Sequence, residues 1–186
     1  MDFEIVLKSI IRDFINNGIR YALIGGYALG ILGISRNTFD LDFLVDKRDK
    51  NKIKNILSNY QYEIKYESEN VIQFVSILKV FGEIDVIYAF RSLSLQMLNQ
   101  AIEKDIFGGE LTVKLLRPED IIAFKLQAIK NDQNRFEGDL FDIKEIINEK
   151  KSLTQDEWIK LNDIFNRFVN HRMKPFKRIR DNYMIL

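Results

Sequence analysis

The sequence predicts a mixed α/β (α+β) fold, in which a twisted mixed sheet is flanked by helices and followed by a helical C-terminal region. Three observations predict it. Short apolar or alternating segments stand between longer segments whose apolar residues are three and four apart. After residue 117 only the helical spacing remains. The 186 residues, 46% of them hydrophobic, suffice for a sizeable core. We expect an α/β core at 1–116 and a helical region with a basic tail at 117–186, packed on the core as a second part or as one single domain.

The first expected elements alternate between helix and strand. Residues 2–17 carry apolar side chains at helical spacing, and Asn17-Gly18 is a typical helix stop. In 39–45, Phe39, Leu41 and other apolar residues alternate with acids, which predicts a strand with one buried face. The remaining elements expected here are a strand at 21–24, helices at 27–32 and 49–60, and strands at 62–66, 71–78 and 83–88.

The later elements are mostly helical. Pro118 suits the first position of a helix that we expect to run to residue 129. Thr154-Gln155-Asp156-Glu157 has the capping-box pattern and predicts the start of another helix, with Trp158 on its packing face. The other elements expected in this part are helices at 94–104 and 136–149 and a strand at 111–116.

Composition excludes several classes of function. A net charge of +1 provides no global attraction to nucleic acid or membrane. The absence of cysteine excludes disulfides, thiolate metal sites and a cysteine nucleophile. No segment reaches the roughly 18 apolar residues of a membrane span, and the first residues lack the pattern of a secretory signal. We therefore expect a cytoplasmic protein with no membrane partner.

Two acidic residues on one strand face are the first candidate site. Asp40 and Asp42 are two residues apart, so both side chains point to the same face of the expected strand. Asp85 stands between apolar residues on a later strand. Adjacent carboxylates repel each other, and a divalent cation such as Mg²⁺ relieves that repulsion. The alternative is a set of solvated acids at strand surfaces.

A glycine pair provides the second candidate feature. Gly25-Gly26 follows a short strand and precedes a short helix. Backbone without side chains can approach a phosphate closely, although the same pair also makes ordinary tight turns. The pair is not a Walker loop, because no Gly-Lys-Ser/Thr follows it.

Together these features resemble the signature of the DNA polymerase beta-like nucleotidyltransferase superfamily. The matching segments, in chain order, are Leu23-Ile24-Gly25-Gly26, then Asp40-Leu41-Asp42-Phe43 after thirteen residues, and Ile84-Asp85-Val86. The resemblance implies the nucleotidyltransferase fold and a magnesium-dependent enzyme. Asp40, Asp42 and Asp85 would be its catalytic and metal-binding residues, and Gly25 and Gly26 would bind the triphosphate.

A narrower resemblance is to the AbiEii and MenT toxin-type nucleotidyltransferases, which share the opening Gly25-Gly26-Tyr27-Ala28 and the segment from Arg36 to Asp42. In that group a later helix brings a Lys and the next helix an Arg and an Asp. Lys125, Arg135 and Asp139 match those positions, but Gly138 stands where the family usually has Lys. The resemblance covers residues 21 to about 147.

The resemblance assigns further nucleotide-binding residues. Lys125 would be both a catalytic and a nucleotide-binding residue that neutralises triphosphate charge, and Arg36 and Asp139 would also bind the nucleotide. Lys125 also falls in the row Ile121, Lys125, Ile129, so its stem points toward the protein body. The alternative is a boundary lysine whose amine reaches water. Asp142 could instead act as a cap or pair with Arg135 or a neighbouring Lys, and Arg36 could be an ordinary surface arginine.

The resemblance implies transfer of NMP from an NTP, ATP included, to a hydroxyl acceptor. The acceptor would be a tRNA or other RNA end, a protein or a small molecule, and the chain could be the toxin of a toxin–antitoxin pair with an antitoxin partner. The alternative is a non-catalytic nucleotide-binding or interaction module on the same fold.

The tail has its own pattern. Between Ile164 and Arg180 there is no acid, and six basic residues stand there with His171, the only histidine. This patch could contact RNA phosphates, but a solvated helix end carries the same composition.

Overall fold

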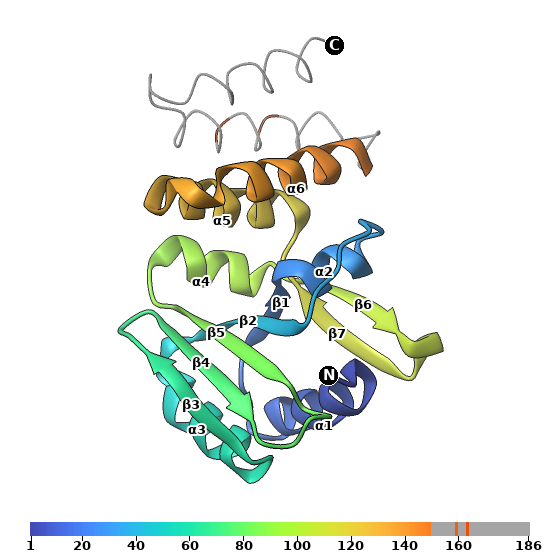
Figure 1. Ribbon diagram of the computed structural model, residues 1–186, viewed down its shortest axis with the longest axis vertical. Helices are drawn as coiled ribbons and strands as arrows, with labels where there is room; N and C mark the ends of the chain where they lie inside the picture. Colours follow the sequence, from blue (N-terminus) through green and yellow to red (C-terminus); the bar gives the residue numbers. More distant parts are fainter. Residues whose placement is uncertain (150–158, 160–162, 164–186) are drawn as a thin grey trace. The chain divides into compact units, whose positions relative to one another are not determined.

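The computed structural model describes residues 1–149, 159 and 163 (Figure 1). The helix expected from the capping box at 154–157, its Trp158 and the basic tail with His171 lie outside the described residues. The chain divides into two compact units, Met1–Arg117 and Pro118–Leu186, and each is considered by itself.

Among the described residues, seven strands of the first unit form one mixed sheet in the order β3-β4-β5-β2-β1-β7-β6 (Figure 1). Strand β2 pairs in parallel with β5, and β1 in parallel with β7, while the other neighbours are antiparallel. The strands are β1 (Tyr21–Ile24), β2 (Asp40–Asp46), β3 (Tyr62–Glu67), β4 (Val71–Ser76), β5 (Glu83–Ala89), β6 (Ile102–Ile106) and β7 (Leu111–Leu115).

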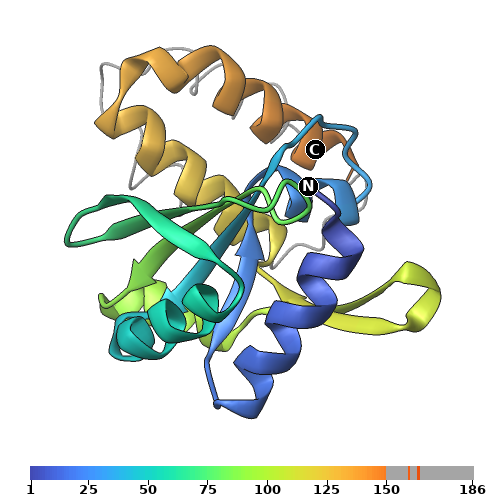
Figure 2. The same ribbon diagram turned by 60° about the horizontal axis from the view of Figure 1, so that its bottom comes forward.

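Helices of the first unit pack against this sheet. They are α1 (Phe3–Asn16), α2 (Gly25–Ile31), α3 (Lys50–Asn59) and α4 (Ser92–Asn99). Helix α1 lies against one face of the sheet (Figure 2), where Phe14 contacts the rings of Tyr21 and Phe43. Helix α2 packs on β1 and β2, and α4 packs on β2 and β5. All four helices contribute buried apolar residues to the core, for example Phe14 of α1 and Ile53 of α3.

The second unit contains two described helices that pack together, α5 (Pro118–Asn131) and α6 (Phe136–Glu149). A 3₁₀ turn at Gln133–Arg135 joins them, and the side chain of Asp132 accepts a hydrogen bond from the backbone N–H of Asn134 at its start. Pro118 occupies the first helical position, as the sequence predicts. The seven-stranded mixed sheet and its helices confirm the predicted mixed α/β fold class.

Three expectations about the elements are wrong. The helix expected at 94–104 ends at Asn99, and Ile102–Ile106 forms β6, which pairs with β7. Edge strand β6 is exposed along its middle, so it lacks the alternating pattern that marks a half-buried strand. Phe39 precedes β2 and is 82% exposed, rather than part of the buried alternation. Helix α2 begins at Gly25 instead of 27.

Across the part of the chain that the structure describes, no helix combines the length and the apolar character needed to cross a membrane. The β6–β7 hairpin extends away from the rest of the sheet (Figure 2). Its turn at Phe107–Gly109 uses positive φ at all three residues.

Candidate metal centre and glycine turn

The parallel pairing of β2 and β5 brings the three predicted carboxylates together. Asp42 lies directly opposite Asp85 in the register, and Asp40 is two residues earlier on the same face of β2. One carboxylate oxygen from each residue lies within 4.8 Å of the other two. All three side chains are half-buried, while Leu41 and Phe43 between and beside them are fully buried. The side chains of β2 thus alternate as the sequence predicts, with Asp40 and Asp42 on one face and Leu41 and Phe43 on the other.

Electrostatics at this cluster disfavour three bare negative charges. Burial raises the pKa of the Asp85 carboxyl above its usual range, and the negative charges of Asp40 and Glu83 raise it further. A hydrogen bond from Gln73 opposes that shift. The Asp40 carboxylate has a hydrogen-bond donor of its own, because the Thr38 hydroxyl donates to its Oδ1 at 2.8 Å. A divalent cation would remove the remaining repulsion.

Gly25 leaves room beside Asp42 that no other residue would leave. Its φ is +67°, in the left-handed region that favours glycine. A Cβ built on Gly25 would lie 1.8 Å from Oδ2 of Asp42, and one built on Gly26 would lie 2.8 Å from the Thr38 side chain. The glycine pair therefore does more than turn the chain, because it brings bare backbone next to the carboxylate cluster.

Gln73 is a site residue that the sequence reasoning did not identify. It lies on β4 directly opposite Asp85, and its Nε2 donates a hydrogen bond to Oδ2 of Asp85 at 2.7 Å. The available signal was its position in 71–78, where it is a polar residue in a half-buried strand. That signal carries no information without the pairing of β4 with β5.

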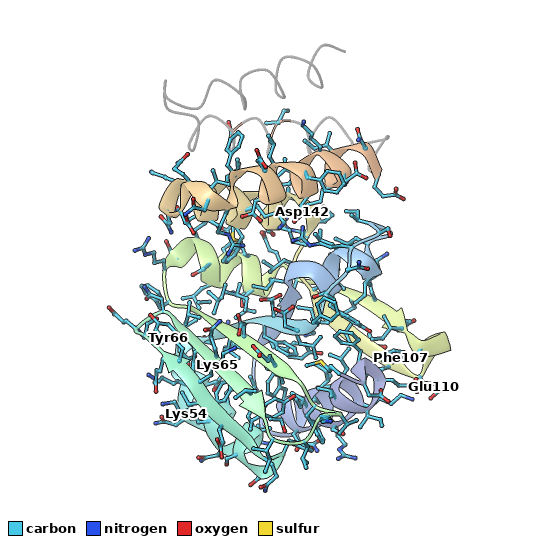
Figure 3. All side chains as sticks on the ribbon, viewed as in Figure 1. Lys54, Lys65, Tyr66, Phe107, Glu110 and Asp142 are labelled. Atoms are coloured by element: carbon cyan, nitrogen blue, oxygen red, sulfur yellow. The ribbon has the colours of Figure 1, made fainter. Side chains whose placement is uncertain are left out.

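The candidate residues of the second unit form a buried ion cluster of their own. The Lys125 ammonium donates to Asp139 at 2.9 Å and to Asp142 at 2.5 Å, and Arg135 donates to Asp139 at 2.9 Å. Asp142 projects from α6 (Figure 3). The side chains of Lys125, Asp139 and Asp142 are only 11%, 5% and 1% exposed. Lys125 thus pairs with both aspartates of α6.

Opposing effects act on Asp139. Burial alone would raise the pKa of its carboxyl, but hydrogen bonds from Arg135 and Lys125, together with their positive charges, lower it below the usual value. The carboxylate is therefore ionised at neutral pH. Arg36, the remaining candidate, lies on the exposed segment that joins α2 to β2.

Comparison with known families gives one match to the sequence. A family model described as "Nucleotidyl transferase AbiEii toxin, Type IV TA system" matches residues 10–184. No curated protein sequence is detectably similar to this chain.

Solved structures share the fold. The antibiotic-resistance factor ANT(2″)-Ia matches with a TM-score of 0.65 and 15% identity over 98% of this chain and 100% of its own. The lincosamide antibiotic adenylyltransferase LnuA, solved with lincomycin bound, matches with a TM-score of 0.56 and 19% identity over 81% and 98%. An antigenic nucleotidyltransferase-like protein from Paracoccidioides brasiliensis matches with a TM-score of 0.53 and 20% identity over 94% and 91%. At these identities the likeness establishes the fold alone.

Proposed function

We propose a reaction from the premise that this chain belongs to the AbiEii nucleotidyl transferase toxin family and is a nucleotidyltransferase. The reaction is magnesium-dependent transfer of NMP from an NTP to a hydroxyl acceptor. The observation that carries it is the convergence of Asp40, Asp42 and Asp85 beside the bare backbone of Gly25. The exposed acids of an ordinary strand surface would not require a glycine next to them.

The donor set fits a hard divalent cation. Three carboxylates offer only oxygen ligands, which Mg²⁺ prefers, and their oxygens are close enough to share one ion or two. Asp40, Asp42 and Asp85 would hold it. When bound, the ion supplies charge neutralisation for the triphosphate and for the reaction centre.

The protein groups have separate tasks in this proposal. Gly25 and Gly26 let the backbone approach the phosphates of the NTP. Asp85, which lies in the same cluster, takes the proton of the acceptor hydroxyl. The acceptor oxygen then bonds to the α-phosphorus, the bond from that phosphorus to the bridging oxygen breaks, and pyrophosphate leaves. Nucleotide-binding roles for Arg36, Lys125 and Asp139 rest on the sequence resemblance.

Several acceptors fit the same chemistry. The family description supports a toxin that acts within a toxin–antitoxin pair, with an RNA end or a protein hydroxyl as acceptor and an antitoxin as partner. The lincosamide adenylyltransferase LnuA and the antibiotic-resistance factor ANT(2″)-Ia, whose folds this chain shares, support a small-molecule hydroxyl instead. The proposal is therefore defined by the donor and the reaction, and the test below identifies the acceptor class.

The test is transfer of label from each of the four α-³²P nucleoside triphosphates, with Mg²⁺, to total RNA, total protein and a panel of aminoglycosides and lincosamides. We expect label in one pool for the wild-type protein. We expect none for Asp42→Ala, because removal of one ligand disrupts the metal site.

A matched control removes a carboxylate elsewhere in the first unit. Glu69 has a side chain that is 79% exposed and forms an ion pair with Lys47. Glu69→Ala should transfer label at the wild-type rate. Equal transfer by wild type and Asp42→Ala would overturn the role of the carboxylate cluster. Absence of both transfer and Mg²⁺-dependent NTP binding would favour a non-catalytic module.

A further inference from the structure

Gln73 is the polar side chain beside the carboxylate cluster that takes no part in the steps above. Its Nε2 donates to Oδ2 of Asp85 at 2.7 Å. We infer that Gln73 is a positioning residue, which fixes the orientation of the Asp85 carboxylate for cation binding and for proton transfer. The inference rests on the proposed function and adds a residue to the same site.

The sheet register places Gln73 beside Asp85. Strand β4 is antiparallel to β5, with Gln73 directly opposite Asp85, and β2 is parallel to β5, with Asp42 opposite Asp85 on the other side. Directly opposed residues on one face have Cβ atoms about 4.5–5.5 Å apart. Asp85 therefore has an amide donor on one flank and a like charge on the other.

The amide of Gln73 and the neighbouring acids have opposite effects on Asp85. The negative charges of Asp40 and Glu83 disfavour the ionised Asp85 carboxylate, and a carboxylate turns freely about its last bond because that torsion is broad. A hydrogen bond from the amide to Oδ2 restricts that rotation and leaves the lone pairs of Oδ1 for other ligands. The amide is neutral, so it orients the carboxylate without cancelling the charge that a cation needs. Groups that orient metal ligands in this way tune metal affinity.

Neighbouring positions indicate that packing alone does not require an amide here. Strand β4 alternates half-buried and buried residues, and Val71, Gln73 and Val75 share the half-buried face. The other two members of this face are valines, the residue type that favours a strand. Next to this row, Lys65 on β3 (Figure 3) pairs with Glu83 at 2.8 Å, so the adjacent acid of β5 has a cationic partner where Asp85 has an amide.

The experiment measures Mn²⁺ affinity by electron paramagnetic resonance, with and without ATP, beside thermal unfolding. Gln73→Met keeps the length of the side chain and removes the donor, whereas Gln73→Asn keeps the amide and shortens its reach. For both variants we expect Mn²⁺ binding weakened about 10- to 100-fold, the usual effect of losing a residue that orients a metal ligand, with little change in unfolding temperature.

Val75→Thr is the matched control, because it changes the same face of the same strand opposite Glu83 rather than Asp85. It should bind Mn²⁺ as the wild type does. Wild-type affinity in Gln73→Met, in a protein whose Mn²⁺ binding is lost in Asp42→Ala, would overturn the positioning role alone. Absence of Mn²⁺ binding in the wild type would overturn the proposed metal site, and this inference with it.

Discussion

At the scale of the residue, the site depends on what is missing from Gly25. Any side chain there would overlap the Asp42 carboxylate, and the positive φ would add backbone strain. Position 25 thus requires glycine for two reasons, the nearby Asp42 carboxylate and the positive φ of the turn.

A second residue-scale feature lies at the other end of β2. Asp46 is buried and accepts hydrogen bonds from Arg48 and Arg20. The side chain of Arg48 is the largest contribution that holds the pKa of Asp46 well below its usual range, against the effect of burial, and the Arg48 backbone N–H and Arg20 add to it.

Asp46→Asn should lower the free energy of unfolding at pH 7 by about 1–3 kcal/mol, because charge-assisted hydrogen bonds are lost. The folded-state pKa is depressed, so the carboxylate stabilises the fold fully above its unfolded pKa of about 3.9, and this stabilisation declines as the pH falls below that value toward the folded-state pKa. Urea unfolding of the wild type and of Asp46→Asn, from pH 7 to pH 3, measures this difference in stability. A difference between them that does not shrink in acid would contradict this account.

At the scale of the element, helices α5 and α6 are joined by an ammonium group that lies between two buried carboxylates. Lys125 of α5 donates to Asp139 and Asp142 of α6, and all three side chains are nearly inaccessible. Removal of one partner from such a cluster leaves buried charge uncompensated. The cluster therefore fixes how these two helices pack, whatever part Lys125 takes in nucleotide binding.

Lys125→Met should lower the free energy of unfolding by about 3–5 kcal/mol, the typical effect of breaking a buried ion pair. The control is Lys144→Met, which changes an exposed lysine of α6 in the same way and should be close to neutral. Urea unfolding followed by circular dichroism measures both. Equal stability of the two variants would show that the Lys125 cluster does not hold the helices together.

At the scale of the whole molecule, much of the fold follows from periodicity. The strands at 21–24 and 83–88 and the helix at 136–149 were predictable because each buries one face or is wholly buried. Strand β6 was not, since an edge strand exposed along its middle gives no alternation. Phe39 was misplaced because an apolar residue beside a strand looks like its continuation, although its side chain faces solvent.

The candidate site was predictable only in part. Asp40 and Asp42 could be paired from a spacing of two on one strand. Asp85 required the superfamily resemblance, because nothing local says which strands become neighbours. Gln73 could not be found at all, since its role exists only in the β4–β5 register. Likewise, the spacing that placed Lys125 toward the protein body could not reveal that Asp139 and Asp142 are its partners.

The most direct test of the central claim is an anomalous difference map from crystals grown with Mn²⁺ and a non-hydrolysable ATP analogue. We predict a peak bound by carboxylate oxygens of Asp40, Asp42 and Asp85, close to the roughly 2.0–2.1 Å typical of Mg²⁺, the ion that Mn²⁺ replaces, with the triphosphate beside Gly25. Nucleotide bound elsewhere, or bound with no peak among these three carboxylates, would contradict the account.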